Sequence, residues 1–281
     1  KRYGTLPFAG LARSAFIAKD ILLSFVVEKI LNKQEVEIFL SNINTISSDI
    51  YKNFYKLNKK KFLQKYGHLR PNTYDITSFN YREGYHLYFD KKHFLKKAKN
   101  KKFEFSKKQL LQIGKKLKKE NINISVINLI KFIKDSISHR EYSKYLFTKN
   151  VSLVLDLIRV LAKKNHITRK DIAYIDINTI LKMYYNLTHE KVEDIFNNEI
   201  KKNKKNYNFN SILKLPDNIL YPSDAYSFDT YTVKSNFITS KNIVGKISLF
   251  NRNKIPECKD KIVLIENADP GYDFIFSHNI K

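Results

Sequence analysis

The chain has 281 residues, 43% of them hydrophobic and 14% aromatic, so it can build a sizeable core and disorder is not its default state. Its single cysteine, Cys258, excludes an intramolecular disulfide framework and a cysteine-based zinc cluster, and it fits a reducing, cytoplasmic compartment. The net charge of +25 comes from 44 Lys and only 8 Arg. Because base-edge and bidentate phosphate recognition favour Arg, we expect a solvated basic surface, with a basic helical nucleic-acid-binding module as the alternative.

The first part of the chain predicts helices. Apolar residues recur at helical spacing over residues 7–33, which fits one long amphipathic helix or two short ones, and again from Glu35 to Leu57. The longest apolar run, Ile21 to Val27, is too short to span a bilayer, so no membrane partner is expected. The stretch from Tyr66 to Asp90 has no helical period but holds two glycines, a proline and many aromatic residues. We expect it to be an ordered loop packed against the helices.

The middle of the chain also predicts helices. Ser106 and Gln109 form a capping-box pattern that begins a helix ending near Lys119. Helical spacing returns over residues 126–147 and again over 151–164. Further short helices are expected to begin at three places: Thr168, Asn178 or Thr179, and just after Thr188. Short helices separated by polar turns favour a mainly α domain of several packed layers.

The pattern changes near residue 221. Short β-branched or aromatic segments predict strands, of which Lys261 to Glu266 is the clearest, and the others cover residues 231–233, 237–239 and 244–250. The segment from Asn267 to Asp273 predicts a turn that leads into a short helix. The expected fold is therefore mainly α, with a multi-helix domain followed by a small, incomplete α/β segment that begins near residue 233.

One loop gathers most of the residues suited to ligand binding. The segment Tyr66–Ser78 holds His68, Arg70 and Asp75 together with several hydroxyl groups. Such a loop can direct a fixed cation and a titratable imidazole toward an anionic or polar ligand. The alternative is a structural loop in which Arg70 and Asp75 pair with each other or with helix ends.

Two further candidates lie on predicted helices. Arg140 and Lys144 are four residues apart and share a helix face, an unfavourable arrangement unless an anion lies between them; a solvated helix face is the alternative. Arg13 is the charged residue of an otherwise apolar segment, residues 8–16, so it either turns inward to a partner or extends its head group to the surface. His278, near the end of the chain, is not assigned a catalytic role.

Several common active-site motifs are absent from the sequence, among them a P-loop, a Gly-x-Gly-x-x-Gly loop, a zinc-protease helix and a nucleophile elbow. The segment Tyr66–Ser78, however, resembles a conserved loop of phosphotransferases related to phosphoenolpyruvate synthase, pyruvate phosphate dikinase and rifampicin phosphotransferase. Residues 140–150 are similar to a helical segment of this family, and residues 261–278 to the entry of its swivelling phosphohistidine domain. Asn72 departs from the family pattern, which has Gly there, but Asn tolerates the left-handed backbone that the turn needs.

The resemblance implies an ATP-dependent phosphotransferase. In this family an ATP-grasp domain passes a phosphoryl group from ATP, with Mg²⁺, to a histidine on the swivelling domain, which delivers it to an acceptor. Residues 1–232 would then form the acceptor-binding helical domain, and residues 233–281 the beginning of the swivelling domain. The chain would be a fragment, inactive alone, because the ATP-grasp domain and the catalytic histidine would lie outside it. It would bind neither ATP nor metal.

The resemblance also implies a small acceptor. The motif set looks like that of family members that phosphorylate the side-chain amide of L-glutamine during capsular phosphoramidate biosynthesis, so we expect an amino acid such as L-glutamine or a 2-oxo acid such as pyruvate. Arg70 and Arg140 would anchor a carboxylate or the travelling phosphoryl group, and His68 would orient the acceptor or move a proton. Arg13, Asp75 and Lys144 complete the set of expected substrate-binding residues.

Overall fold

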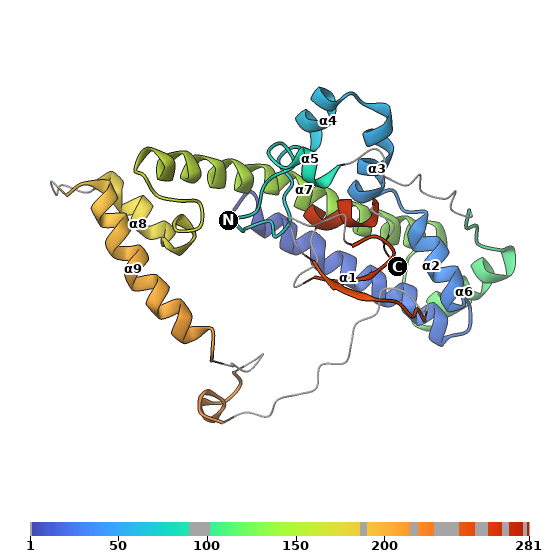
Figure 1. Cartoon of the computed structure of the whole chain (residues 1–281). Helices are drawn as coiled ribbons and strands as arrows, with labels where there is room; N and C mark the ends of the chain where they lie inside the picture. Colours follow the sequence, from blue (N-terminus) through green and yellow to red (C-terminus); the bar gives the residue numbers. More distant parts are fainter. Residues whose placement is uncertain are drawn as a thin grey trace. The chain divides into compact units, whose positions relative to one another are not determined.

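The computed structural model describes residues 2–89, 102–185, 190–213, 219–227, 242–250, 258–265, 270–277 and 280. The described chain is mainly helical with one small sheet, which confirms the expected mainly α class (Figure 1). The α-helices are α1 (Thr5–Val27), α2 (Lys33–Ser41), α3 (Ile46–Lys56), α4 (Lys59–Tyr66), α5 (Tyr85–Tyr88), α6 (Lys107–Lys119), α7 (Val126–Lys164), α8 (Ile177–Lys182) and α9 (Val192–Asn210). Short 3₁₀ helices are η1 (Ile172–Tyr174), η2 (Met183–Tyr185), η3 (Pro222–Ala225) and η5 (Pro270–Ser277).

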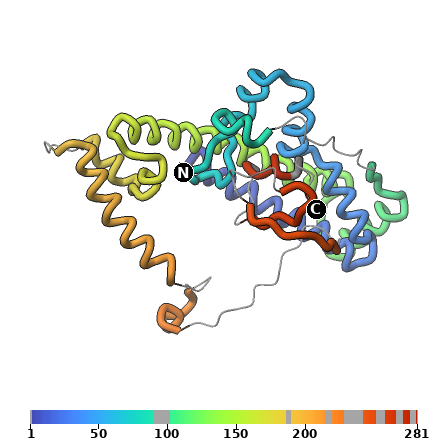
Figure 2. Tube along the Cα trace, viewed as in Figure 1, coloured from blue at the N-terminus to red at the C-terminus, as the bar shows by residue number. Residues whose placement is uncertain are grey.

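The chain forms two compact units. The first contains Lys1–Tyr74, Ser78–Leu153 and Ile243–Lys281, and the second contains Asp75–Thr77 and Val154–Asn242. This grouping differs from the expected division into residues 1–232 and 233–281, whose boundary lies outside the described residues. The reason is that buried aromatic residues near the C-terminus belong to a core built by the first helices, so the C-terminal part of the chain returns to the first unit (Figure 2).

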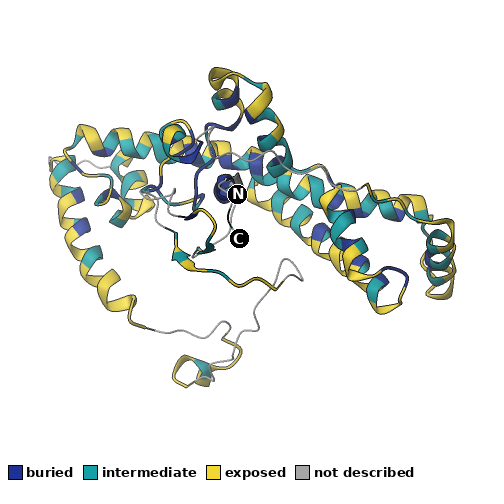
Figure 3. Cartoon of the chain, turned by 45° about the vertical axis from the view of Figure 1, so that its right-hand side comes forward, coloured by how far each residue is buried: buried dark blue, intermediate teal, exposed yellow. Residues whose placement is uncertain are grey.

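One core of the first unit lies among α1, α2, α6 and the beginning of α7. Leu22, Phe39, Ile113 and Ile133 are almost completely buried in it. Buried and exposed positions alternate along these helices, as expected where one helix face covers a core (Figure 3). Asn32 and Ser106 begin α2 and α6 with reciprocal capping boxes, and the one at Ser106 was predicted from the sequence.

Two helix predictions need correction. The segment Glu35–Leu57 forms two helices instead of one, because Thr45 caps the start of α3 and makes a reciprocal bond with Ser48. Residues 126–147 and 151–164 form one helix, α7, of 39 residues instead of two. The polar residues 148–150 between the two segments do not end the helix. The Thr148 hydroxyl, for example, donates to the Tyr145 carbonyl one turn earlier and stays within the helix.

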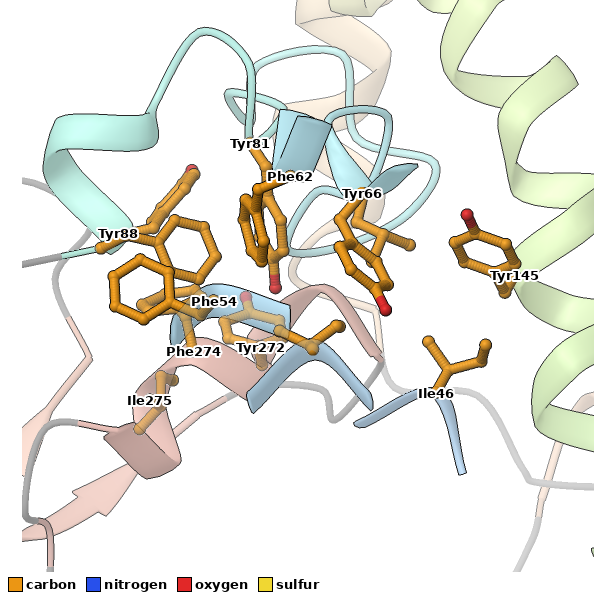
Figure 4. Close-up of a cluster of buried hydrophobic side chains, with 13 residues drawn as sticks. Ile46, Phe54, Phe62, Tyr66, Tyr81, Tyr88, Tyr145, Tyr272, Phe274 and Ile275 are labelled. Carbon is orange, nitrogen blue, oxygen red and sulfur yellow. The ribbon is translucent and has the colours of Figure 1, made fainter. Parts of the chain in front are cut away.

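The second core of the first unit is aromatic, and the C-terminal segment completes it. Tyr272, Phe274 and Ile275 of η5 are buried against α3, α4, α5 and the loop between α4 and α5 (Figure 4). The Tyr81 hydroxyl donates to the Gly271 carbonyl at 3.0 Å, and the Ser47 hydroxyl donates to Asp273 at 2.5 Å. The short helix expected after the turn is η5, and it is part of a core, whereas residues 267–269 of the expected turn lie outside the described residues.

A small parallel sheet accompanies this segment. Strands β1 (Ile247–Leu249) and β2 (Ile262–Leu264) pair in parallel, with Ile247 opposite Ile262 and Leu249 opposite Leu264. Both fall within predicted strands, although each is shorter than expected. The predicted strands at 231–233 and 237–239, and His278, lie outside the described residues.

The second unit is built around α8 and α9. Phe196 and Ile200 of α9 are buried together with Ile172 of η1 and Ile167. The start predicted at Thr168 gives only the 3₁₀ turn η1. There the Asp171 carboxylate accepts bonds from Lys204 and Thr168, and these bonds lower its pKa. Asp176 caps α8 in place of the expected Asn178 or Thr179, and Thr188 lies outside the described residues. No described helix is both long and apolar enough to cross a membrane.

Candidate functional site

A groove of about 850 Å³ lies in the first unit between the beginning of α1 and the middle of α7. We call it the α1–α7 groove. Its α7 wall is a helical stripe that runs from His139 through Tyr142 and Leu146 to Asn150, and each of these residues follows the last at helical spacing. The rings of Phe8 and Phe147 lie 5.3 Å apart and hold the two helices together beside it.

The lining of this groove combines apolar surface with hydrogen-bond donors. Tyr142 and Leu146 remain about half exposed, at 49% and 42%, so the groove offers apolar contact area to a ligand. Arg2, His139 and Asn150 add polar groups, and among the described residues no Asp or Glu lines the groove. A site with a cation, neutral donors and no carboxylate suits an anionic ligand that has some apolar surface.

His68 contacts the same helix segment at Tyr145, a residue that does not line the groove. Its Nε2 donates to the Tyr145 carbonyl at 3.1 Å, and its ring lies 4.9 Å from the Tyr145 ring. The pKa of His68 is lowered to about 4, mainly by burial; the bond to Tyr145 partly opposes this shift, and the nearby charges of Lys149 and Arg82 add to it. The imidazole is therefore neutral at pH 7 and holds the loop after α4 against α7.

The low pKa of His68 makes the folded state less stable in mild acid. The unfolded chain binds a proton at this histidine below about pH 6.5, whereas the folded chain does so only near pH 4. This contribution is complete above pH 6.5, and we expect about 2–3 kcal/mol to be lost as the pH falls from 6.5 toward 4. In urea unfolding across this range, the free energy of unfolding of His68→Gln should depend less steeply on pH than that of the unmodified chain. His139→Gln, at an exposed position, is the control, and an equal slope in both variants would contradict the assignment.

Arg70 is a buried structural residue. Only 2% of its surface is exposed, and its guanidinium donates to the Ser78 carbonyl at 3.3 Å and to the Ser152 hydroxyl at 3.1 Å. These bonds connect the loop to itself and to α7. Two residues later Asn72 has φ 52°, which confirms the left-handed backbone expected at this turn.

The other expected substrate-binding residues do not gather around Arg70. Arg13 is exposed on α1, so it does not turn inward. Arg140 pairs with Glu141 at 2.7 Å and lies 5.7 Å from the ring of Phe16, and the adjacent carboxylate removes the need for an anion between it and Lys144. Asp75 belongs to the second unit, where it accepts bonds from the amide and hydroxyl of Thr77.

No family model matches the chain, and no match is found among curated proteins or solved structures. The described residues also contain no group of three or more His, Cys, Asp or Glu placed to hold a metal ion.

Sequence reasoning found part of this site. Tyr142 and Asn150 lie in the α7 segment that resembles the family, residues 140–150, and His139 directly precedes it, but neither these residues nor Arg2 were expected to bind the substrate. The helical spacing of His139, Tyr142 and Asn150 was visible in the sequence. What the sequence lacked was the identity of the partner helix, because the groove exists only where α1 packs beside α7.

Proposed function

We propose that this chain is the acceptor-binding part of an ATP-dependent phosphotransferase and that the α1–α7 groove holds a small organic acid such as L-glutamine or pyruvate. The observation that carries the proposal is the position of the groove. The α7 segment that resembles the phosphoenolpyruvate-synthase-related enzymes, residues 140–150, supplies most of one wall.

The chemistry of the lining supports the same proposal. Arg2 would bind a carboxylate, and the side chains of His139 and Asn150 would fix its orientation by hydrogen bonds. His68 and Arg70 would act indirectly, as positioning residues that hold the adjacent loop on α7. ATP and Mg²⁺ would be bound by a domain outside this chain, so the residues described would bind and orient the acceptor.

Calorimetric titration of the chain with L-glutamine, pyruvate and related acids tests the proposal. The double variant His139→Ala/Asn150→Ala should weaken binding about tenfold, because each lost hydrogen bond contributes about 0.5–1.5 kcal/mol. Both residues are exposed, so the fold should survive. His86→Ala, an exposed histidine on α5 outside the groove, is the matched control and should bind normally.

Two results would reject the proposal. One is the absence of binding by any of the acids. The other is salt-sensitive binding of duplex DNA or RNA that the groove variant leaves unchanged, which would favour the basic nucleic-acid-binding alternative.

A further inference from the structure

A second cavity, of about 250 Å³, lies in the first unit where the ends of α1 and α6 meet the beginning of α7. We call it the α1–α6 pocket; it shares no lining residue with the α1–α7 groove. Its walls include the buried side chains of Phe25, Ile113 and Leu117. Because an apolar cavity of about 150 Å³ holds a benzene molecule, this pocket has room for a hydrocarbon group of about six to ten non-hydrogen atoms.

Charged residues lie at the edge of this apolar pocket. Glu28 and Lys116 form an ion pair at 2.6 Å, with 42% and 38% of their side chains exposed. Glu120 also lines the pocket and is exposed, and it forms no ion pair with any residue that the structure describes. The Glu28 carboxylate is therefore paired with Lys116, whereas the Glu120 carboxylate can bind a cationic ligand.

Both carboxylates stand at positions that favour a cation. Glu28 is the C-cap of α1 and Glu120 is the C-cap of α6, where the helix dipole places partial negative charge. A carboxylate there adds to that charge, and a positive group beside it is stabilised. Lys116 meets Glu28, whereas Lys118 and Lys119 of the same turn do not line the pocket.

We propose that the α1–α6 pocket binds a small amphipathic amine, a ligand beyond the acceptor of the proposed function. The protonated amino group would lie against the Glu120 carboxylate and the carbonyl end of α6. The hydrocarbon part would fill the space between Phe25, Ile113 and Leu117. The two parts of the site thus select for charge and for apolar size separately.

Three six-carbon probes separate these contributions: n-hexylamine, 1-hexanol and hexanoate, each titrated into the chain at pH 7 and followed by calorimetry and by NMR of the lining residues. The amine should bind roughly three- to fivefold more tightly than the alcohol, because one partly exposed charge pair contributes up to about 1 kcal/mol. Hexanoate should bind most weakly. Glu120→Gln should reduce the advantage of the amine over the alcohol to less than about twofold.

Two variants act as controls. Glu104→Gln makes the same charge change at an exposed position outside the pocket and should leave the order of the probes unchanged. Ile122→Trp adds bulk at a lining residue that is 53% exposed, so it should obstruct all three probes without overfilling the core. Equal binding of amine and alcohol, an amine advantage that survives Glu120→Gln, undiminished binding in Ile122→Trp, or no binding of hexylamine would each overturn the proposal.

Discussion

Replacing Gly271 with alanine should destabilise the first unit by about 3 kcal/mol or more, although the substitution adds only one methyl group. A β-carbon at this position would lie 1.7 Å from the Arg70 carbonyl oxygen and 2.6 Å from the Pro71 nitrogen. Both neighbours are backbone atoms in a buried loop, so no side chain can rotate away. Gly271 does not have a positive φ, and the requirement for glycine is therefore one of space.

Thermal and urea unfolding of Gly271→Ala measure this effect, and a fall in Tm on the order of 10 °C corresponds to the expected loss. Gly10→Ala is the matched control, because Gly10 lies exposed within α1 and a β-carbon there would meet no atom within 4 Å. Since alanine favours the helix, this control should raise stability by about 0.5–1 kcal/mol. A Gly271→Ala chain as stable as the unmodified chain would show that η5 does not pack against the Arg70 loop.

Truncating Phe274 to alanine should destabilise the first unit by about 3–5 kcal/mol. The ring is completely buried, 4.6 Å from the ring of Tyr88 and 6.1 Å from that of Phe250, and a cavity would replace it. Hydrogen exchange read by mass spectrometry should then rise in the segments that share this core, α3 to α5 and η5.

Phe196→Ala is the paired variant for the second unit. Phe196 is also completely buried, but it belongs to the core that α9 forms with η1. We expect this variant to increase exchange in residues 154–210 and to affect η5 less than Phe274→Ala does. If both variants gave the same exchange pattern, the division of the chain into two compact units would be wrong.

Local signals predicted much of the secondary structure. The capping box at Ser106 set the start of α6 correctly, because both of its bonds join residues three positions apart. The outer ends of α7 were also predicted, since its apolar spacing extends to Lys164. The break between α2 and α3 was not predicted, because the helical spacing of apolar residues continues past the cap at Thr45.

The candidate site was less predictable because its contacts join distant residues. Arg70 looked like a ligand-binding cation, but it bonds to Ser152, 82 positions later, and this contact makes it structural. The His68 imidazole is likewise fixed by Tyr145, 77 positions later. The sequence showed which residues can bind an anion, whereas the packing of helices decided which of them remain accessible.

The return of the C-terminal segment affects how this protein can fold during synthesis. Tyr81 and Gly271, which bond in the aromatic core, are 190 positions apart. A ribosome that adds about 5–20 residues per second needs about 10–40 s to make the intervening chain. During that time α3, α4 and α5 expose an aromatic surface that later receives Tyr272 and Phe274, so the nascent chain offers a binding site for chaperones until η5 emerges.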